Sequence, residues 1–296
     1  MSCGRRLDVS ADAFGWLHET RIDRGTDAAD RLSADGYVFL RDCLDPDLVE
    51  AARRRLLEQL DSLGMLREGA AAADGIARVP WPRRSFHDLA TDNEPLQRLL
   101  YAGSMIATFE RLLGGAVRHF DFTWMRVMPC GPGTAPHADS VYMNRGTSRL
   151  YTAWTPLMEI PLQIGGLIIM PGSHRLERLR PYFDADVDTV CTNLPPRMPQ
   201  DVHGWVGPVG DGKLANDPAT LRRKLGLPWL TAQTYRPGDV LVFGIHTLHA
   251  SLDNTTARLR LSTDTRYQPA AEPADPRWIG RKPPGHGPQS RRDLIC

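Results

Sequence analysis

The chain has 296 residues with 36 basic and 35 acidic side chains, so its formal net charge is +1, and 42% of its residues are hydrophobic. This balance excludes the strong basic excess of a nucleic-acid scaffold, and no apolar run approaches the roughly 20 residues that span a membrane. Five scattered cysteines without a CxxC pair, and an N-terminus without an apolar leader, predict a cytoplasmic protein with no disulfide framework and no cysteine-based zinc site.

The first 115 residues carry the helical signals. Residues 37–40 are apolar and predict a short strand. The next stretch predicts a helix with Asp45 as its N-cap and Pro46 at its first position. Apolar residues then recur every three or four positions up to Leu63, which is the pattern of an amphipathic helix. Residues 94–113 predict one or two further helices that end at a pair of glycines.

From residue 116 onwards the pattern changes to strands, which are predicted at 117–128, 149–158, 165–170, 230–236, 240–244 and 258–267. Helices followed by strands indicate the α+β class, here mainly β, with the helices packed against one all-β barrel or sandwich. One domain is predicted over residues 1–296, with a helical part up to about residue 115 and a C-terminal tail at 269–296. A long loop at 181–217, which includes His203 and Trp205, predicts a lid or binding loop.

Two copies of a His-x-Asp pattern are candidates for metal binding. On an extended backbone, positions i and i+2 point to the same face, so His137 and Asp139 can present an imidazole and a carboxylate to one ion. A second histidine from another strand would complete a two-histidine, one-carboxylate set, which leaves three positions open and favours Fe(II). The other copy, His119 with Asp121, lies inside a predicted strand and is interpreted as an ordinary strand pair. The later copy follows a glycine-rich loop, a better place for an accessible ion.

Residues 236–267 supply candidates for the second histidine. Two strands are predicted around a loop that holds His246 and His249. Period 2 in the second strand places four polar residues on one face: Arg258, Arg260, Ser262 and Asp264. A histidine at the end of one strand and an inward arginine on the next suit a metal site beside an anion site. The residues alone leave the choice between the two histidines open.

Further motifs lie between and after these candidates. The chain contains, in order, Trp154-Thr155-Pro156-Leu157, Gly165-Gly166-Leu167 and Pro171-Gly172-Ser173-His174. His249 then begins a pattern whose matching positions are Ser251, Asn254, Thr255, Arg260 and Ser262. With these motifs, and with an N-terminal strand and helix at 35–56, the sequence resembles the phytanoyl-CoA hydroxylase family of Fe(II)/2-oxoglutarate dioxygenases over roughly residues 32–268.

The resemblance implies a double-stranded β-helix, or jelly-roll, core at about residues 116–268, cupin-like, with the N-terminal helices packed on its major sheet. It implies the metal ligands His137, Asp139 and His249. His249 is chosen over His246 because Arg260 follows it by the family's interval of eleven residues. Arg260 is then expected to pair with the distal carboxylate of 2-oxoglutarate through its planar, bidentate guanidinium.

The resemblance also implies further contacts with the cosubstrate. Thr152 stands where relatives place a hydroxyl beside the same distal carboxylate. Ser262 is expected to add a second hydroxyl, and Ser251 is assigned to the cosubstrate site with the rest of its motif. Arg126 is a candidate for the other end of the cosubstrate, with a surface ion pair as the alternative. Structural roles are expected for His246 and His174, and Arg258 is expected to be a solvated charge at a strand edge.

The implied activity is that of an Fe(II)- and 2-oxoglutarate-dependent dioxygenase, which uses O2 to hydroxylate an unactivated C–H bond of a small molecule, expected in bacterial secondary metabolism. Related halogenases have a small residue at the position of Asp139, so this carboxylate favours hydroxylation. Desaturation, epimerisation and ring formation would use the same ligands. A cupin-like metalloenzyme without 2-oxoglutarate is disfavoured by Arg260, and a non-catalytic jelly-roll binding protein by the full ligand set. No nucleic-acid or membrane partner is expected, and no oligomeric state is predicted.

Overall fold

The structure is a computed structural model that describes residues 1–22, 25–82, 86–185 and 212–283. Its α-helices are α1 Gly25–Asp35, α2 Pro46–Ser62, α3 His87–Thr91, α4 Glu94–Tyr101, α5 Gly103–Leu113, α6 Ser140–Met143, α7 Arg180–Phe183 and α9 Pro218–Leu225. Short 3-10 turns lie at Ala72–Asp74, Leu162–Ile164, Ser173–Arg175, Glu177–Leu179 and Pro276–Trp278. No helix in these ranges is long and apolar enough to cross a membrane.

The strands are β1 Phe14–Trp16, β2 Glu19–Thr20, β3 Tyr37–Leu40, β4 Val117–His119, β5 Trp124–Met128, β6 Tyr151–Pro156, β7 Ile160–Pro161, β8 Leu167–Ile169, β9 Trp229–Thr231, β10 Thr234–Tyr235, β11 Val240–Gly244, β12 His249–Ser251 and β13 Arg260–Pro269. The large sheet has the order β2-β3-β11-β6-β13-β4, with β5 also paired to β13. A smaller sheet has the order β1-β9-β8-β12, and β10 pairs with β7. The long strand β13 lies at the centre of this arrangement, because β6 pairs with one side of it and β5 and then β4 with the other.

The predicted amphipathic helix after Asp45 is confirmed as α2. The Asp45 side chain accepts a hydrogen bond from the backbone N–H of Asp47, and Pro46 starts the helix. Most of its apolar stripe is buried, and the helix packs against α4, while Leu63 lies beyond its last turn and is exposed. Asn93 caps α4 and donates from Nδ2 to the carbonyl of Ala52, so the two helices are also joined by a buried hydrogen bond.

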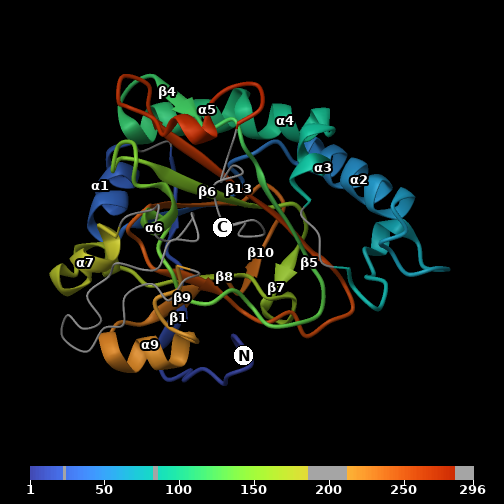
Figure 1. Ribbon diagram of the computed structural model, residues 1–296, viewed down its shortest axis with the longest axis horizontal. Helices are drawn as coiled ribbons and strands as arrows, with labels where there is room; N and C mark the ends of the chain where they lie inside the picture. Colours follow the sequence, from blue (N-terminus) through green and yellow to red (C-terminus); the bar gives the residue numbers. More distant parts are fainter. Residues whose placement is uncertain (23–24, 83–85, 186–211, 284–296) are drawn as a thin grey trace.

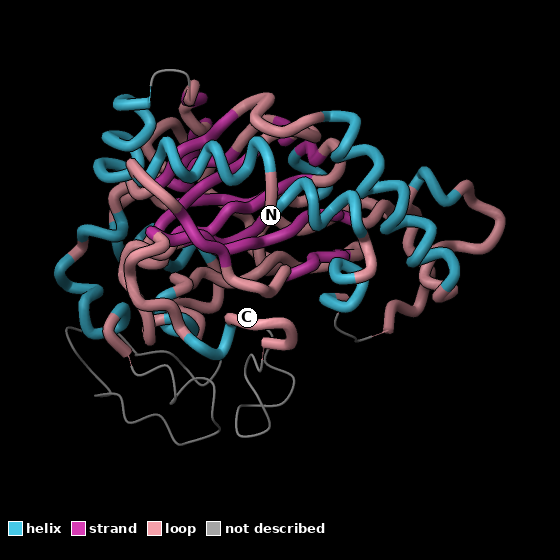
Figure 2. Tube along the Cα trace, turned by 90° about the horizontal axis from the view of Figure 1, so that it is seen from above, coloured by secondary structure: helices cyan, strands magenta, loops and turns pink. Residues whose placement is uncertain are grey.

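The N-terminal helices cover one face of the large sheet (Figures 1 and 2). Phe109 of α5 stacks on Tyr267 of β13, with ring centroids 4.0 Å apart, and the Tyr267 hydroxyl donates to the carbonyl of Leu100. Helices α1 to α5 and this face of the sheet share one hydrophobic cluster. Because side chains alternate along a strand, the neighbour of Tyr267, Arg266, faces the other side. A second cluster, which includes Trp124, Ile168, Trp229, Leu248 and Ala250, also takes in side chains of α7 and α9.

Several predicted strands differ from the observed ones. The run 117–128 is two strands, β4 and β5, because β13 pairs with each in turn and residues 120–123 between them leave the ladder. The run 230–236 is likewise divided into β9 and β10. The last strand begins at Arg260, so Arg258 is exposed and outside it. In the tail, Trp278 is buried in the second cluster.

Candidate active site

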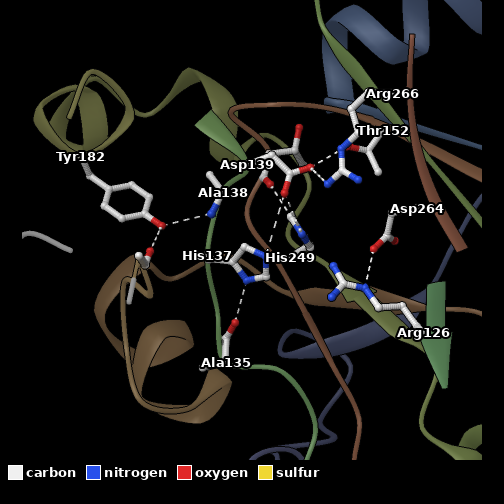
Figure 3. A network of polar contacts seen from close by, with 12 residues as sticks. Arg126, Ala135, His137, Ala138, Asp139, Thr152, Tyr182, His249, Asp264 and Arg266 are labelled. Carbon is white, nitrogen blue, oxygen red and sulfur yellow. Dashed lines mark hydrogen bonds and ion pairs between the residues drawn. The ribbon is translucent and has the colours of Figure 1, made fainter. Parts of the chain in front are cut away.

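The three side chains predicted as metal ligands meet on the inner face of the large sheet (Figure 3). His137 and Asp139 lie just before α6, and His249 is the first residue of β12. The backbones of His137 and His249 exchange two hydrogen bonds, at 3.0 and 2.9 Å. The Nε2 atoms of His137 and His249 lie 4.0 and 3.7 Å from Oδ1 of Asp139, and the three ligand atoms lie within 4.8 Å of one another. One ion can therefore reach all three atoms, since bonds from imidazole and carboxylate to a metal are about 2.0–2.2 Å long.

Hydrogen bonds behind the two imidazoles determine which ring nitrogen is free. Nδ1 of His137 lies 2.8 Å from the carbonyl oxygen of Ala135, and Nδ1 of His249 lies 3.1 Å from that of Thr247. A carbonyl oxygen only accepts, so each Nδ1 holds the proton and donates it. Nε2 of the neutral ring then keeps its lone pair on the side of Asp139. These outer hydrogen bonds orient both Nε2 atoms so that they could hold a metal ion.

The second carboxylate oxygen of Asp139 has different partners. Oδ2 accepts one hydrogen bond from Oγ1 of Thr152 at 2.5 Å and another from Arg266 at 3.0 Å. The guanidinium of Arg266 also lies over the ring of Trp124, with Cζ 4.1 Å from the centroid. Between His137 and Asp139, the N–H of Ala138 donates to the hydroxyl of Tyr182. The His-x-Asp segment is therefore held from β6, β13 and α7 at once (Figure 3).

Burial and nearby charges shift the pKa of both residues of this pair. Burial, followed by repulsion from His249, lowers the pKa of His137 to about 3. Burial acts to raise the pKa of Asp139, but attraction by Arg266 and then by the two imidazoles outweighs it and holds that pKa below its ordinary value. At neutral pH the pair is an uncharged imidazole and a carboxylate, which are the states that bind a metal ion.

A pocket opens beside these residues on the inner face of β13. The charged side chains that line it are Arg126, Arg260, Arg266, Asp139 and Asp264. Nε of Arg126 donates to Asp264 at 2.7 Å. Burial, followed by repulsion from Arg126, lowers the pKa of Arg260 to about 10, so it stays charged at neutral pH. Three guanidiniums against two carboxylates make the pocket favourable for an anion.

Arg260 is buried and only partly satisfied by the protein. Its Nη1 donates to the carbonyl of Gly165 at 2.5 Å, but its Nε has no hydrogen-bond partner among the described residues. The same is true of Oγ of Ser262, which shares the face of β13 with Arg260. A buried donor without an acceptor costs free energy, and an anion in the pocket would supply the acceptor.

The structure places Thr152 away from Arg260 along the large sheet. In the register of β6 with β13, Thr152 pairs with Arg266, six positions along the strand from Arg260. Its hydroxyl has one proton, which it donates to Asp139, and its contact with a cosubstrate stays a prediction. Thr152 therefore lies at the Asp139 end of the pocket.

Of the other two predicted cosubstrate residues, Arg126 lines the described pocket and Ser251 does not. Oγ of Ser251 accepts a hydrogen bond from the backbone N–H of Thr134 at 2.8 Å, and Ser251 is not part of the lining of the described pocket. It joins β12 to the loop before His137. Arg126 lines the pocket and also forms the ion pair with Asp264 that was its alternative interpretation.

The residues not expected to bind the metal or the cosubstrate make structural contacts. The ring of His246 packs on Phe183, with centroids 5.2 Å apart. Nε2 of His174 lies 3.0 Å from the carbonyl of Ser33. Arg258 is exposed and donates to the carbonyl of Asp74. None of these three lines the described pocket.

Sequence analysis missed Arg266 and its partner Trp124. The signal for Arg266 was present, because the alternation that places Arg260 and Asp264 on one face of β13 places Arg266 there as well. Its contact with Asp139 joins positions 127 residues apart, and no local pattern reports such a contact. The predicted lid residues His203 and Trp205 lie outside the described part of the chain.

Comparison with known proteins gives a family and several relatives. The model of the phytanoyl-CoA dioxygenase family matches residues 32–262. A 1-deoxypentalenic acid 11-beta-hydroxylase from Streptomyces exfoliatus is 29% identical over 256 residues, which cover 80% of this chain and 78% of the relative. The protein of the same name from Streptomyces arenae is 28% identical over the same shares of both chains.

Solved structures show the same fold at lower identity. The epimerase SnoN, in complex with Fe3+, alpha-ketoglutarate and nogalamycin RO, matches with a TM-score of 0.57 at 22% identity. The match covers 89% of this chain and 94% of the SnoN chain. The non-heme alpha-ketoglutarate-dependent carbocyclase SnoK has a TM-score of 0.57 at 20% identity, with 88% and 90% covered. EctD from S. alaskensis has a TM-score of 0.57 at 20% identity, with 100% and 95% covered.

Proposed function

This chain belongs to the phytanoyl-CoA dioxygenase family, and on that premise we propose that it hydroxylates an unactivated C–H bond of a small molecule. It is a non-haem iron, 2-oxoglutarate-dependent dioxygenase, and the relatives found by sequence are named hydroxylases. For its architecture we propose a double-stranded β-helix core inside one domain over residues 1–296, with the N-terminal helices on the major sheet. The cytoplasmic setting expected from the sequence stays a prediction.

The proposed iron site is formed by His137, Asp139 and His249. Its support is the donor set, which consists of one carboxylate and two imidazoles whose Nε2 atoms keep their lone pairs. Two histidines and one carboxylate suit Fe(II) and leave other positions open. Iron, when bound, supplies the activation of O2 with 2-oxoglutarate as the source of electrons. The chain holds the three donors in fixed orientations and keeps their surroundings largely free of bulk water.

The proposed anchor for 2-oxoglutarate is Arg260. The support is a buried guanidinium whose Nε has no acceptor among the described residues, beside the unpartnered hydroxyl of Ser262. Each charge-assisted hydrogen bond to the distal carboxylate would contribute about 1.5–3 kcal/mol. Arg126, which lines the same pocket, stays a candidate for the other end of the cosubstrate.

Hydroxylation is proposed as the outcome because the relatives found by sequence are named hydroxylases. Structural neighbours include an epimerase and a carbocyclase, but their identity to this chain is 22% or lower, so they support the fold and not the outcome. We assign the substrate to the small molecules of bacterial secondary metabolism. Mass analysis of the product distinguishes the outcomes, since hydroxylation adds one oxygen atom, desaturation and ring formation remove two hydrogens, and epimerisation leaves the mass unchanged.

The single observation that carries the proposal is the convergence of His137, Asp139 and His249 on one point. His249→Ala removes one of the three donors and is expected to abolish Fe(II)-dependent formation of succinate from 2-oxoglutarate. His246→Ala is the matched control on the same loop and is expected to retain activity, because its ring packs on Phe183. Wild-type activity in His249→Ala would overturn the assignment.

A further inference from the structure

The two oxygens of the Asp139 carboxylate face different partners in the structure. Oδ1 faces the Nε2 atoms of His137 and His249, at 4.0 and 3.7 Å. Oδ2 accepts hydrogen bonds from Thr152 and Arg266, at 2.5 and 3.0 Å. Asp139, Thr152 and Arg266 are all buried, so bulk water does not compete for these contacts.

The two donors to Oδ2 lie on a rigid support. Thr152 and Arg266 are direct register partners on β6 and β13, so their side chains leave the large sheet side by side. The Arg266 guanidinium is held against the ring of Trp124. Its Nε and Nη1 have no hydrogen-bond partner in the described part of the chain. Among the described residues, the Arg266 side chain therefore donates hydrogen bonds only to Asp139.

We propose that Thr152 and Arg266 are positioning residues that reserve Oδ2, so that Asp139 presents only Oδ1 to the metal. This inference rests on the proposed function. A two-histidine, one-carboxylate set keeps three positions open only when the carboxylate occupies a single one. A carboxylate that turned and bound through both oxygens would occupy a position that the chelating 2-oxoacid needs. Thr152 and Arg266 thus support cosubstrate binding without touching the cosubstrate.

The test separates this role from direct contact between Thr152 and the cosubstrate. Thr152→Val removes the hydroxyl at nearly constant volume, and its Fe(II) affinity is measured anaerobically without 2-oxoglutarate. If Thr152 acts by holding Oδ2 of Asp139, the Fe(II) Kd of this variant should rise about 10- to 100-fold, as is usual when a hydrogen bond behind a metal ligand is removed. The same role also predicts a weaker visible band when 2-oxoglutarate is added at saturating Fe(II). Direct contact predicts an unchanged Fe(II) Kd and a change only after 2-oxoglutarate is added, a result that would overturn the inference.

Two further variants control the experiment. Thr152→Ser keeps the hydroxyl and is expected to restore Fe(II) affinity to within about 3-fold of wild type, which a purely structural role of the methyl group would not do. Thr155→Val is the matched control, because Thr155 is equally buried on β6 and its hydroxyl has no partner among the described residues. Its Fe(II) affinity is expected to equal that of the wild type. If wild type binds Fe(II) and Thr152→Val binds it equally, the inference fails and the proposed function stands; a wild type that binds no Fe(II) overturns both.

Discussion

The two His-x-Asp segments of this chain have the same pattern and opposite surroundings. His119 and Asp121, at the end of β4, have side chains 31% and 36% exposed beside a cleft of about 610 Å³. His137 and Asp139 have side chains 12% and 3% exposed. Among the described residues, only the second pair is joined by a third potential metal ligand, His249. The copy that sequence analysis favoured for an ion is thus the one that meets a second histidine, and it is also the buried one.

The difference lies in how each carboxylate is stabilised. Asp121 is partly solvated and accepts from the backbone N–H of Gly280 at 2.6 Å. Asp139 is removed from water, and a buried carboxylate must be matched by donors or by a metal. Thr152 and Arg266 supply these donors. Burial thus makes Asp139 depend on partners from two other segments, β6 and β13, and those partners also orient it.

The largest expected effect comes from removing the carboxylate of each His-x-Asp pair in turn. Asp139→Ala removes a proposed ligand and leaves Arg266 buried without its anion, so we expect loss of iron binding and a loss of about 3–5 kcal/mol in the free energy of unfolding. Asp121→Ala removes a partly exposed interaction and is expected to cost about 1 kcal/mol or less, with iron binding retained. Iron content after anaerobic loading and urea denaturation measure the two quantities. Similar results for the two variants would remove the distinction between the pairs.

The next effect concerns the pH dependence of the buried pair. The pKa of His137 is lowered from 6.5 to about 3 on folding, so between these values the unfolded chain binds a proton that the folded chain does not. The free energy of unfolding of the metal-free protein should then rise with pH across this window, by up to about 1.4 kcal/mol per pH unit from this residue. Denaturation curves at several pH values measure the slope, and His137→Gln should reduce it. A slope that is unaffected by the substitution contradicts the shift.

The arginines near the start of β13 extend the comparison to the anion site. Arg260→Met removes the proposed anchor and is expected to weaken 2-oxoglutarate binding about 10- to 150-fold, the equivalent of one charge-assisted hydrogen bond of about 1.5–3 kcal/mol. Arg258→Met removes an exposed arginine two positions earlier and should leave that affinity unchanged. Anaerobic titration of the iron-loaded protein with 2-oxoglutarate measures both. Equal affinities in the two variants would discard the role of Arg260.

The smallest expected effect concerns the hydrogen bond that joins the two ligand-bearing segments. Ser251→Ala removes the acceptor of the Thr134 N–H, before His137. Thr134 is exposed, so water can replace part of the lost bond, and we expect a loss of about 0.5–1.5 kcal/mol in the free energy of unfolding with iron and 2-oxoglutarate binding retained. Thermal unfolding and the two titrations test this. A marked loss of 2-oxoglutarate affinity would instead return Ser251 to the cosubstrate site.

Local patterns predicted those parts of the structure that depend on neighbouring residues. The Asp45 cap, Pro46 and the apolar stripe of α2 are set within a few turns of one helix, and the prediction is confirmed. Period 2 correctly placed Arg260, Ser262 and Asp264 along one strand. The break between β4 and β5 was not predicted, because it depends on the register of each with β13, far away in the sequence.

The sequence by itself determined the types of residue at the site and their order, namely His137, Asp139, His249 and Arg260, because motif spacing is a property of the chain alone. Only the tertiary structure decided that Asp139 is held by Thr152 and Arg266, and that Thr152 lies at this end of the pocket. Strand register between β6 and β13 sets those contacts. Register depends on pairing between distant segments, and a shift of one residue would turn each side chain to the opposite face of the sheet.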